Sequence, residues 1–285
     1  MTARRARAAP LDRTEADESD AGEPMCTLIV LHRCVPGSPV VVAANRDEFL
    51  ERPAEPPRLR ESARGQLFVA PRDCRAGGTW LGVNAAGLFV GITNRPNPQP
   101  DPSRRSRGQV VVDALAAQTA EEAACRALEI ASGAHNPFNL LLADRDRAFT
   151  VVYEDAPKLQ EIGSGVHVIG NADPDARDVP KIGRLFARAE RAAAGPADQV
   201  LSALAALCRG HEGASPREDA CIHAGRYGTH SSALLRLRVD GEGDEFWFAD
   251  GPPCVAPYED FSPLLLALDH GVRQRGGDAW ARMTS

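Results

Sequence analysis

The sequence contains no Cys-x-x-Cys pair, although it has seven cysteines. An odd number of cysteines without that spacing fits neither a disulfide framework nor a zinc knuckle. Free thiols suit a reducing compartment, so we expect a cytoplasmic protein that holds no metal. The cysteines are spread along the chain, at Cys26, Cys34, Cys74, Cys125, Cys208, Cys221 and Cys254.

The chain also lacks long apolar runs and any excess of basic residues. No apolar stretch approaches the roughly 20 residues that a membrane helix requires, so no transmembrane segment is expected. The net charge is -6 and the isoelectric point is about 5.7, whereas a nucleic-acid surface needs clustered Lys and Arg to neutralise phosphates. The arginines here are scattered, so we expect no nucleic-acid partner.

The first 24 residues lack the apolar segment of a secretory signal. Their arginines are followed by an acidic stretch, which a transit peptide should not contain. Residues 1–24 are therefore expected to be a disordered tail or the product of a start codon assigned too early. The alternative is a propeptide whose removal exposes Cys26, which directly follows Met25. The remaining length suits a single domain over residues 26–270, with a C-terminal tail at 271–285.

The sequence does contain a regular succession of strand signals. Stretches rich in Val, Ile and Leu that are bounded by Gly, Pro and Asn predict hairpins, whereas the proline-rich segment 51–65 predicts a surface loop. Strands joined mainly by hairpins favour antiparallel sheets over a doubly wound parallel sheet. The predicted strands cover residues 26–34, 40–44, 79–83, 88–94, 138–143, 149–153, 159–162, 166–170, 229–239 and 245–249.

Helices are expected in pairs between these strands. Ser106 is a candidate N-cap, and Thr119 with Glu122 matches a capping box for a second helix. The polar segment 94–106 before them predicts a mobile loop. The predicted helices cover residues 106–118, 119–133, 181–194 and 196–209, and a short one begins at 262.

Six short motifs occur in order along the chain, and their joint occurrence is specific. They are Met25-Cys26-Thr27, Asn45-Arg46-Asp47-Glu48, Gly77-Gly78-Thr79-Trp80-Leu81-Gly82-Val83-Asn84, Thr93-Asn94-Arg95, Gly170-Asn171 and Tyr227-Gly228-Thr229-His230-Ser231-Ser232. On these motifs the chain resembles the NRDE family, also called the transport and Golgi organisation family, over most of residues 26–268. That family is similar to the N-terminal-nucleophile (Ntn) hydrolases, in particular the linear-amide group that includes the bile-salt and penicillin V acylases.

The resemblance implies an α+β fold, a four-layer αββα sandwich with two antiparallel sheets between helical layers. It also implies a catalytic set that begins with Cys26 as nucleophile. In the acylases the Arg and Asp that hold the nucleophile are spaced, whereas their counterparts here are adjacent, and the late Arg also departs from the acylase spacing. The set consists of Cys26, Arg46, Asp47, Asn94, Asn171 and Arg184.

The chemistry of this set favours acyl transfer. A guanidinium such as that of Arg46 is expected to lower the pKa of the Cys26 thiol, because it favours the charged thiolate. A free α-amine on Cys26 titrates near neutrality and accepts the thiol proton, while Asp47 orients the amine. The side-chain amides of Asn94 and Asn171 donate to the oxyanion of a tetrahedral intermediate.

Each assignment has a structural alternative. Cysteine is among the most buried residue types, so Cys26 also fits core packing. Arg46, Asp47 and Glu48 fit an ion-pair network that fixes the end of a strand. Asn84 opens an Asn-Ala-Ala-Gly turn, which indicates a turn residue rather than a ligand.

The histidines and the other cysteines show no established ligand spacing. Cys221-Ile222-His223 and His230 lie close in sequence but match no known metal pattern, so they are interpreted as core or loop residues. The segment from Thr229 to Ser232 is expected to open a strand, with hydroxyls that tie down the neighbouring loop. The cysteines interpreted as packing residues are Cys34, Cys74, Cys125, Cys208 and Cys254.

Three kinds of function stay open, each with a small-molecule or lipid-like ligand. The first is hydrolysis or acyl transfer by Cys26 on a linear amide or a similar acyl compound, which requires no cofactor. The second is non-catalytic binding and trafficking of haem or an acyl-lipid, which the association of animal family members with haem mobilisation and lipid metabolism implies. Without a Cys-x-x-Cys-His attachment, haem would be held non-covalently, and His32, His167 and Cys26 are unranked as its ligands. The third is an inactive scaffold; the oligomeric state is left open.

Overall fold

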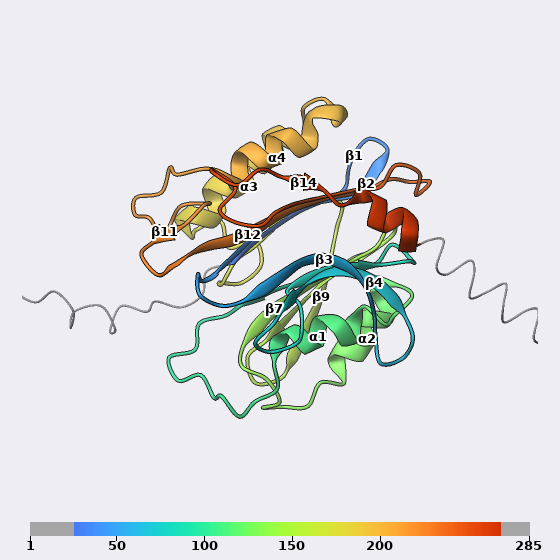
Figure 1. Ribbon diagram of the computed structural model, residues 1–285, viewed down its shortest axis with the longest axis vertical. Helices are drawn as coiled ribbons and strands as arrows, with labels where there is room; N and C mark the ends of the chain where they lie inside the picture. The colour runs from blue at the N-terminus through green and yellow to red at the C-terminus, as the bar shows by residue number, and fades with distance from the viewer. Residues whose placement is uncertain (1–25, 269–285) are drawn as a thin grey trace, which may run out of the picture.

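Two antiparallel sheets stack face to face between two layers of helices in the computed structural model, which describes residues 26–268 (Figure 1). This arrangement is the predicted αββα sandwich of the α+β class, and the prediction is confirmed. The expected tails at 1–24 and 271–285 lie outside the described residues.

The first sheet, sheet A, carries the candidate site. Its strands are β1 (Thr27–Val35), β2 (Ser38–Phe49), β10 (Gly165–Ile169), β11 (His223–Ala224), β12 (Tyr227–Leu237), β13 (Glu245–Ala249) and β14 (Glu259–Asp260). Their order is β10-β1-β2-β12-β13-β14, and β11 pairs with β12 outside this path. Every residue from Ser38 to Asp47 is buried, because β2 is central and both faces of the sheet are covered.

The second sheet, sheet B, follows chain order throughout. Its strands are β3 (Ala54–Glu61), β4 (Leu67–Asp73), β5 (Leu81–Asn84), β6 (Phe89–Asn94), β7 (Phe138–Ala143), β8 (Ala148–Tyr153) and β9 (Pro157–Ile162). Short connections explain this order, since antiparallel neighbours can be joined by tight turns. At one of these turns the Asn84 side chain accepts hydrogen bonds from the main-chain N–H groups of Ala86 and Leu88, at 3.0 and 3.1 Å. Asn84 is therefore the turn residue that its motif predicts.

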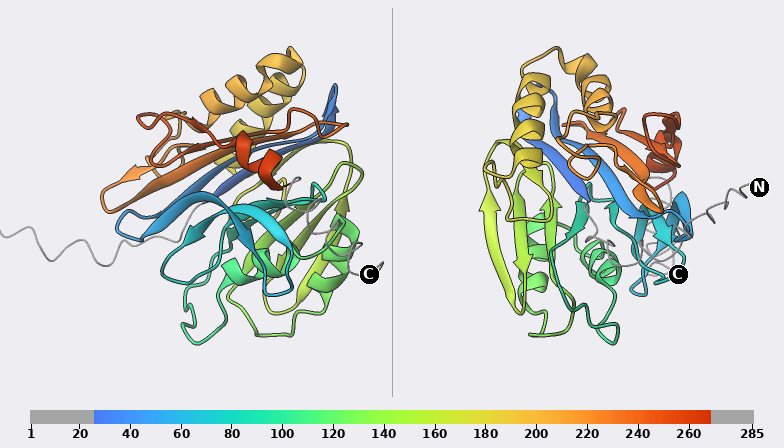
Figure 2. Two further views of the ribbon diagram at one scale, coloured as in Figure 1. Left: turned by 45° about the vertical axis from the view of Figure 1, so that its right-hand side comes forward. Right: turned by 90° about the vertical axis from the view of Figure 1, so that its left-hand side faces the viewer.

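The helices cover the outer face of each sheet (Figure 2). On sheet B lie α1 (Arg107–Ala114) and α2 (Ala120–Leu128), and on sheet A lie α3 (Pro180–Ala193), the 3-10 helix η1 (Ala197–Gln199) and α4 (Val200–Cys208). One apolar cluster lies under each helical layer. A third fills the space between the sheets, and Val30, Val42 and Leu141 are among its fully buried members. Helical backbone also occurs at 262–268. Within residues 26–268, every helix is too short or too polar for a bilayer span.

The proline-rich segment 51–65 differs from its prediction as a loop, because it contains β3. This strand lies at the edge of sheet B. The register between β3 and β4 shifts between Glu55 and Arg58, which is where Pro56 and Pro57 stand. Proline cannot donate to a strand ladder, so it is tolerated at edges and irregularities of this kind.

The predicted capping signals had different outcomes. The Thr119 hydroxyl accepts a hydrogen bond from the main-chain N–H of Glu122 at 3.1 Å, so the predicted cap of α2 is confirmed. Ser106 precedes α1 but makes no side-chain cap. Both helices end earlier than predicted, at Ala114 and Leu128.

Candidate active site at the end of sheet A

Three neighbouring strands bring distant motifs to one end of sheet A. β2 continues through the motif at 45–48 instead of ending before it. On one side β1 pairs with it, and Thr27 lies opposite the first residue of the motif, so that Cys26 stands beside the strand. On the other side Thr229 of β12 lies opposite Asp47.

The pleat of β2 sends the adjacent Arg46 and Asp47 to opposite faces of the sheet. The Arg46 guanidinium faces sheet B, 4.4 Å from the centroid of the Trp80 ring and 3.4 Å from Oδ2 of Asp73. Asp47 faces the helical layer, where its Oδ2 lies 3.8 Å from Nζ of Lys181 on α3. The two residues therefore approach the end of β1 from opposite sides of one strand.

The Cys26 thiol is held in its neutral form in this chain, in which Met25 precedes it. Its Sγ lies 3.7 Å from the main-chain oxygen of Asp47. Burial and the Asp47 carboxylate raise the pKa of Cys26 to about 12, and the opposing attraction of Arg46 is smaller. Arg46 thus lowers the thiol pKa as predicted, but in the chain that retains Met25 burial outweighs this effect.

Asp47 is fully buried and only partly satisfied. Its Oδ1 accepts a hydrogen bond of 2.6 Å from the Thr229 hydroxyl, which in turn accepts one of 2.8 Å from the main-chain N–H of Ile222. Among the described residues, Oδ2 of Asp47 and Nζ of Lys181 have no hydrogen-bond partner. Burial raises the pKa of Asp47 to about 7 and lowers the pKa of Lys181, in each case against their mutual attraction. The pair leaves a buried acceptor available to a further donor.

An ion-pair network also fixes the end of β2. Arg52 lies 3.4 Å from Glu48 and 2.7 Å from Asp73, and Asp73 also contacts Arg46. The structural alternative for Arg46 and Glu48 is therefore present. Thr229 likewise ties down the segment before β12, as its motif predicts.

A cavity of about 430 Å³ opens beside Cys26. Both sheets contribute to its wall, as do the segment predicted as a mobile loop and the first residues of α1. The wall is strongly charged. Its ionisable residues besides Cys26 are Arg46, Asp47, Glu48, Arg52, Asp73, Arg75, Asp101, Arg104, Arg105 and Arg107, and Asp47 among them directs its carboxylate toward α3.

The structure brings Asn94 to this wall but not Asn171 or Arg184. Asn94 lines the cavity, and Nδ2 of Asn171 donates to the main-chain oxygen of Asn94 at 2.7 Å. Arg184 lies on α3, where its Nη2 donates to the main-chain oxygen of Glu218 at 2.6 Å. Catalytic roles for Asn171 and Arg184 stay predictions, and the geometry places Asn171 behind Asn94.

Lys181 is the functional candidate that sequence reasoning missed. Its side chain is 8% exposed, and it stands in the first turn of α3, in register with the buried Leu185 and Ala189. A lysine aligned with an apolar helix face was the available signal. Its partner Asp47 lies too far along the chain for a local pattern to reveal the pair.

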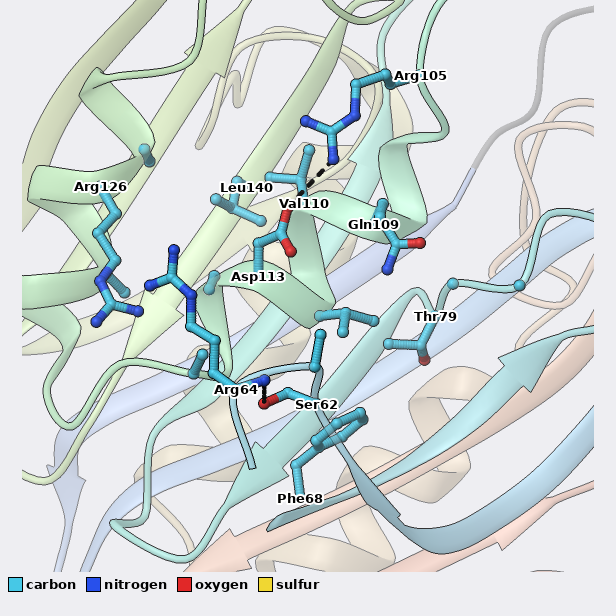
Figure 3. Close-up of a pocket in the computed structure, with 18 of the residues that line it drawn as sticks. Ser62, Arg64, Phe68, Thr79, Arg105, Gln109, Val110, Asp113, Arg126 and Leu140 are labelled. Carbon is cyan, nitrogen blue, oxygen red and sulfur yellow. Dashed lines mark hydrogen bonds and ion pairs between the residues drawn. The ribbon is translucent and has the colours of Figure 1, made fainter. Parts of the chain in front are cut away.

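A larger cavity of about 1240 Å³ lies on the helical side of sheet B (Figure 3). Arg105 and Asp113 form an ion pair of 3.6 Å at its wall, and the main-chain N–H of Arg64 donates to the Ser62 hydroxyl at 3.3 Å. Its described lining residues include no cysteine. The predicted nucleophile Cys26 therefore lies at the smaller cavity and not at the larger one.

A separate group of side chains could hold a metal ion. It consists of His211, Cys221, His223 and Cys254, each of which offers one ligand atom within 4.8 Å of the others. The sequence alone favours packing or loop roles for Cys221, His223 and Cys254.

Known proteins resemble the chain in sequence and in fold. The family model described as Transport and Golgi organisation 2 matches residues 25–245. A Transport and Golgi organization protein 2 homolog from Homo sapiens is 26% identical over 229 residues, which are 71% of this chain and 83% of that protein. Penicillin V acylase from Agrobacterium tumefaciens has a TM-score of 0.53 at 18% identity. This match covers 84% of this chain and 88% of the acylase chain. The Caenorhabditis elegans N-acylethanolamine-hydrolyzing acid amidase ortholog has a TM-score of 0.51 at 12% identity. This match covers 74% of this chain and 92% of the amidase chain. These two structures show that the sandwich has the Ntn-hydrolase fold.

Proposed function

This chain belongs to the Transport and Golgi organisation 2 family, and from that premise we propose that it is an N-terminal-nucleophile amidohydrolase or acyltransferase. Its nucleophile is Cys26, and its substrate is a linear amide or a similar acyl compound. The proposal is carried by the convergence of Cys26, Arg46 and Asp47 at one cavity between the sheets. The structural neighbours are an acylase and an amidase by name, which supports the reaction class and leaves the substrate open.

The proposal requires Cys26 to be the first residue of the active chain. The family match begins at residue 25, which supports a start at Met25 followed by its removal. The freed α-amine can donate a hydrogen bond to Oδ2 of Asp47. This oxygen is buried and has no hydrogen-bond partner among the described residues. Asp47 would thus hold the amine beside the thiol of its own residue.

The reaction then follows from these positions. The α-amine takes the thiol proton, and the Cys26 sulfur forms a bond to the carbonyl carbon of the amide as an electron pair moves to the oxygen. The side-chain amide of Asn94 donates to that oxyanion. Collapse breaks the C–N bond, and the leaving amine takes the proton from the α-ammonium. Water, or another acceptor in acyl transfer, then cleaves the thioester and restores the thiol.

The non-catalytic alternative, binding of haem or an acyl-lipid, has less support from the wall of the cavity. Such ligands need extended apolar surface, whereas charged side chains dominate this wall. Among its described lining residues no histidine offers a nitrogen to haem iron. A reducing compartment such as the cytoplasm suits the proposed thiol chemistry, since all seven cysteines carry free thiols.

The test compares the full chain with a chain that begins at Cys26. Intact-mass spectrometry of the native protein should show the second form, and only that form should release free amine from a panel of linear N-acyl amides. Cys26→Ala should abolish the release, whereas Cys125→Ser, at an exposed cysteine on α2, should not change it. A native chain that retains residues 1–25 and still hydrolyses amides would sink the proposal. Saturable haem binding at about one equivalent, without hydrolysis, would favour the carrier.

A further inference from the structure

Three segments meet on sheet A away from the Cys26 cavity. The connection from α4 to β11 carries His211 and Cys221, β11 begins with His223, and the loop after β13 carries Cys254. Cys221 and His223 are two residues apart, which lets both side chains point to one side of an extended segment. One ligand atom of each of the four residues lies within 4.8 Å of those of the other three.

The separations of these atoms suit a tetrahedral zinc ion. Zn–S bonds of about 2.3 Å and Zn–N bonds of about 2.0–2.1 Å imply S···S and S···N separations of about 3.8 and 3.6 Å. The Sγ atoms of Cys221 and Cys254 are 3.6 Å apart, and Nε2 of His223 lies 3.7 Å from the first and 3.1 Å from the second. Small adjustments would bring all three to ideal positions around a metal.

The fourth donor is His211, which has a carboxylate beside it. Its Nδ1 lies 3.7 Å from Oδ2 of Asp219, while Oδ1 of Asp219 accepts a hydrogen bond of 2.7 Å from the main-chain N–H of Gly213. The His211 and His223 rings have centroids 5.3 Å apart. A carboxylate on one ring nitrogen is the usual companion of a metal-binding histidine, because it fixes the ring and leaves the other nitrogen for the metal.

We propose that His211, Cys221, His223 and Cys254 bind one Zn²⁺ ion. Two thiolates and two imidazoles are a donor set that selects zinc. Four protein ligands leave no open position for substrate, so the ion is structural. The proposal does not depend on the activity of Cys26 and stands or falls separately from it.

The zinc site lies next to the groups that hold Asp47. Its ligand Cys221 precedes Ile222, whose main-chain N–H donates to the Thr229 hydroxyl, and that hydroxyl donates to Asp47. On the other side of Cys221, the main-chain oxygen of Ala220 accepts a hydrogen bond of 2.7 Å from Asn45. Zinc would therefore fix the segment against which the end of β2 is oriented.

Metal analysis of the full chain tests the site directly. The protein is purified under reductant, loaded with Zn²⁺ and desalted, and zinc is measured by mass spectrometry; the expected content is about one equivalent. Cys254→Ser and His211→Gln should lower the affinity for Zn²⁺ in a competition with a chromogenic chelator. Asp219→Asn should weaken it by about 10–100-fold, as expected for a residue that orients a ligand. Cys125→Ser, the exposed control, should match the parent chain.

Cobalt keeps the test independent of how well the variants fold. Co²⁺ added to the parent chain should give the visible absorption of a tetrahedral, thiolate-ligated ion, and Zn²⁺ should displace it. A parent chain that binds neither ion, or zinc affinities that are equal in the parent and the ligand variants, would overturn the proposal. A Cys221–Cys254 disulfide that persists in the presence of reductant and Zn²⁺ would overturn it as well.

Discussion

The Asp47 carboxyl allows a quantitative test of the charge arrangement at the end of sheet A. Burial raises its pKa from 3.8 to about 7, so between these values the folded chain holds a proton that the unfolded chain has released. A raised folded-state pKa contributes stability that is present below the unfolded value and is lost as the pH rises through the folded value. Asp47→Asn removes this titration and keeps a polar side chain of similar size.

The magnitude follows from the two pKa values. A rise from 3.8 to about 7 corresponds to about 4 kcal/mol of free energy of unfolding. Relative to Asp47→Asn, the parent chain should therefore lose about that amount between pH 4 and pH 8. With Lys181→Met in both chains the difference should increase, because the attraction that opposes the burial of Asp47 is then gone.

Urea denaturation at a series of pH values measures this difference. Taking the difference between two chains cancels the titrations that the substitution leaves unchanged, and the Lys181→Met background removes a neighbouring group whose pKa Asp47 shifts, so the slope reports on residue 47. In a chain that begins at Cys26, the new α-ammonium should lower the pKa of Asp47 and reduce the slope. Parallel stability curves for the parent and Asp47→Asn would refute the assignment of a buried, weakly compensated carboxylate.

Three further predictions concern the neighbours of Asp47. Thr229→Val should lower the free energy of unfolding by about 2–3 kcal/mol, because it leaves the Asp47 carboxyl and a main-chain N–H unsatisfied; Thr229→Ser, which keeps the hydroxyl, is the control in urea denaturation. Arg46→Gln should raise the pKa of the Cys26 thiol further and slow its alkylation at fixed pH, whereas Arg46→Lys should not; equal rates would make Arg46 purely structural. In the chain that begins at Cys26, Asn94→Ala should lower kcat by about 10²–10³-fold with little change in KM, and an unchanged kcat would exclude Asn94 as an oxyanion donor.

Signals that act over a few residues were sufficient to predict much of the fold. Thr119 and Glu122 are three residues apart, and the turn at Asn84 closes within four, so each pattern contains all of its partners. Hairpin order indicated antiparallel sheets, and the family resemblance implied their αββα arrangement. By contrast, β3 could not be predicted, because proline in a strand is acceptable only once the strand is known to be an edge.

The site was predictable where it coincides with the motifs and not where it depends on packing. Cys26, Arg46, Asp47 and Asn94 all line one cavity, and their catalytic roles stay predictions. Their motifs do not reveal that α3 places Lys181 on Asp47. The pair joins a strand near the start of the chain to a helix far along it, and only the stacking of that helix on sheet A brings them together. The proposed zinc ligands were missed for the same reason, since two loops and the first residue of β11 supply them with no repeated spacing.

The chemistry of Cys26 is coupled to the state of its own nitrogen. While Met25 is attached, that nitrogen is an amide with no basic lone pair, burial and Asp47 keep the thiol protonated, and the attraction of Arg46 does not reverse this. Removal of residues 1–25 supplies a base within the same residue. Once this amine has taken the thiol proton, it is a cation whose charge offsets that of Asp47 and stabilises the thiolate that remains. The proposed activity should therefore appear with the new N-terminus and need no other rearrangement of sheet A.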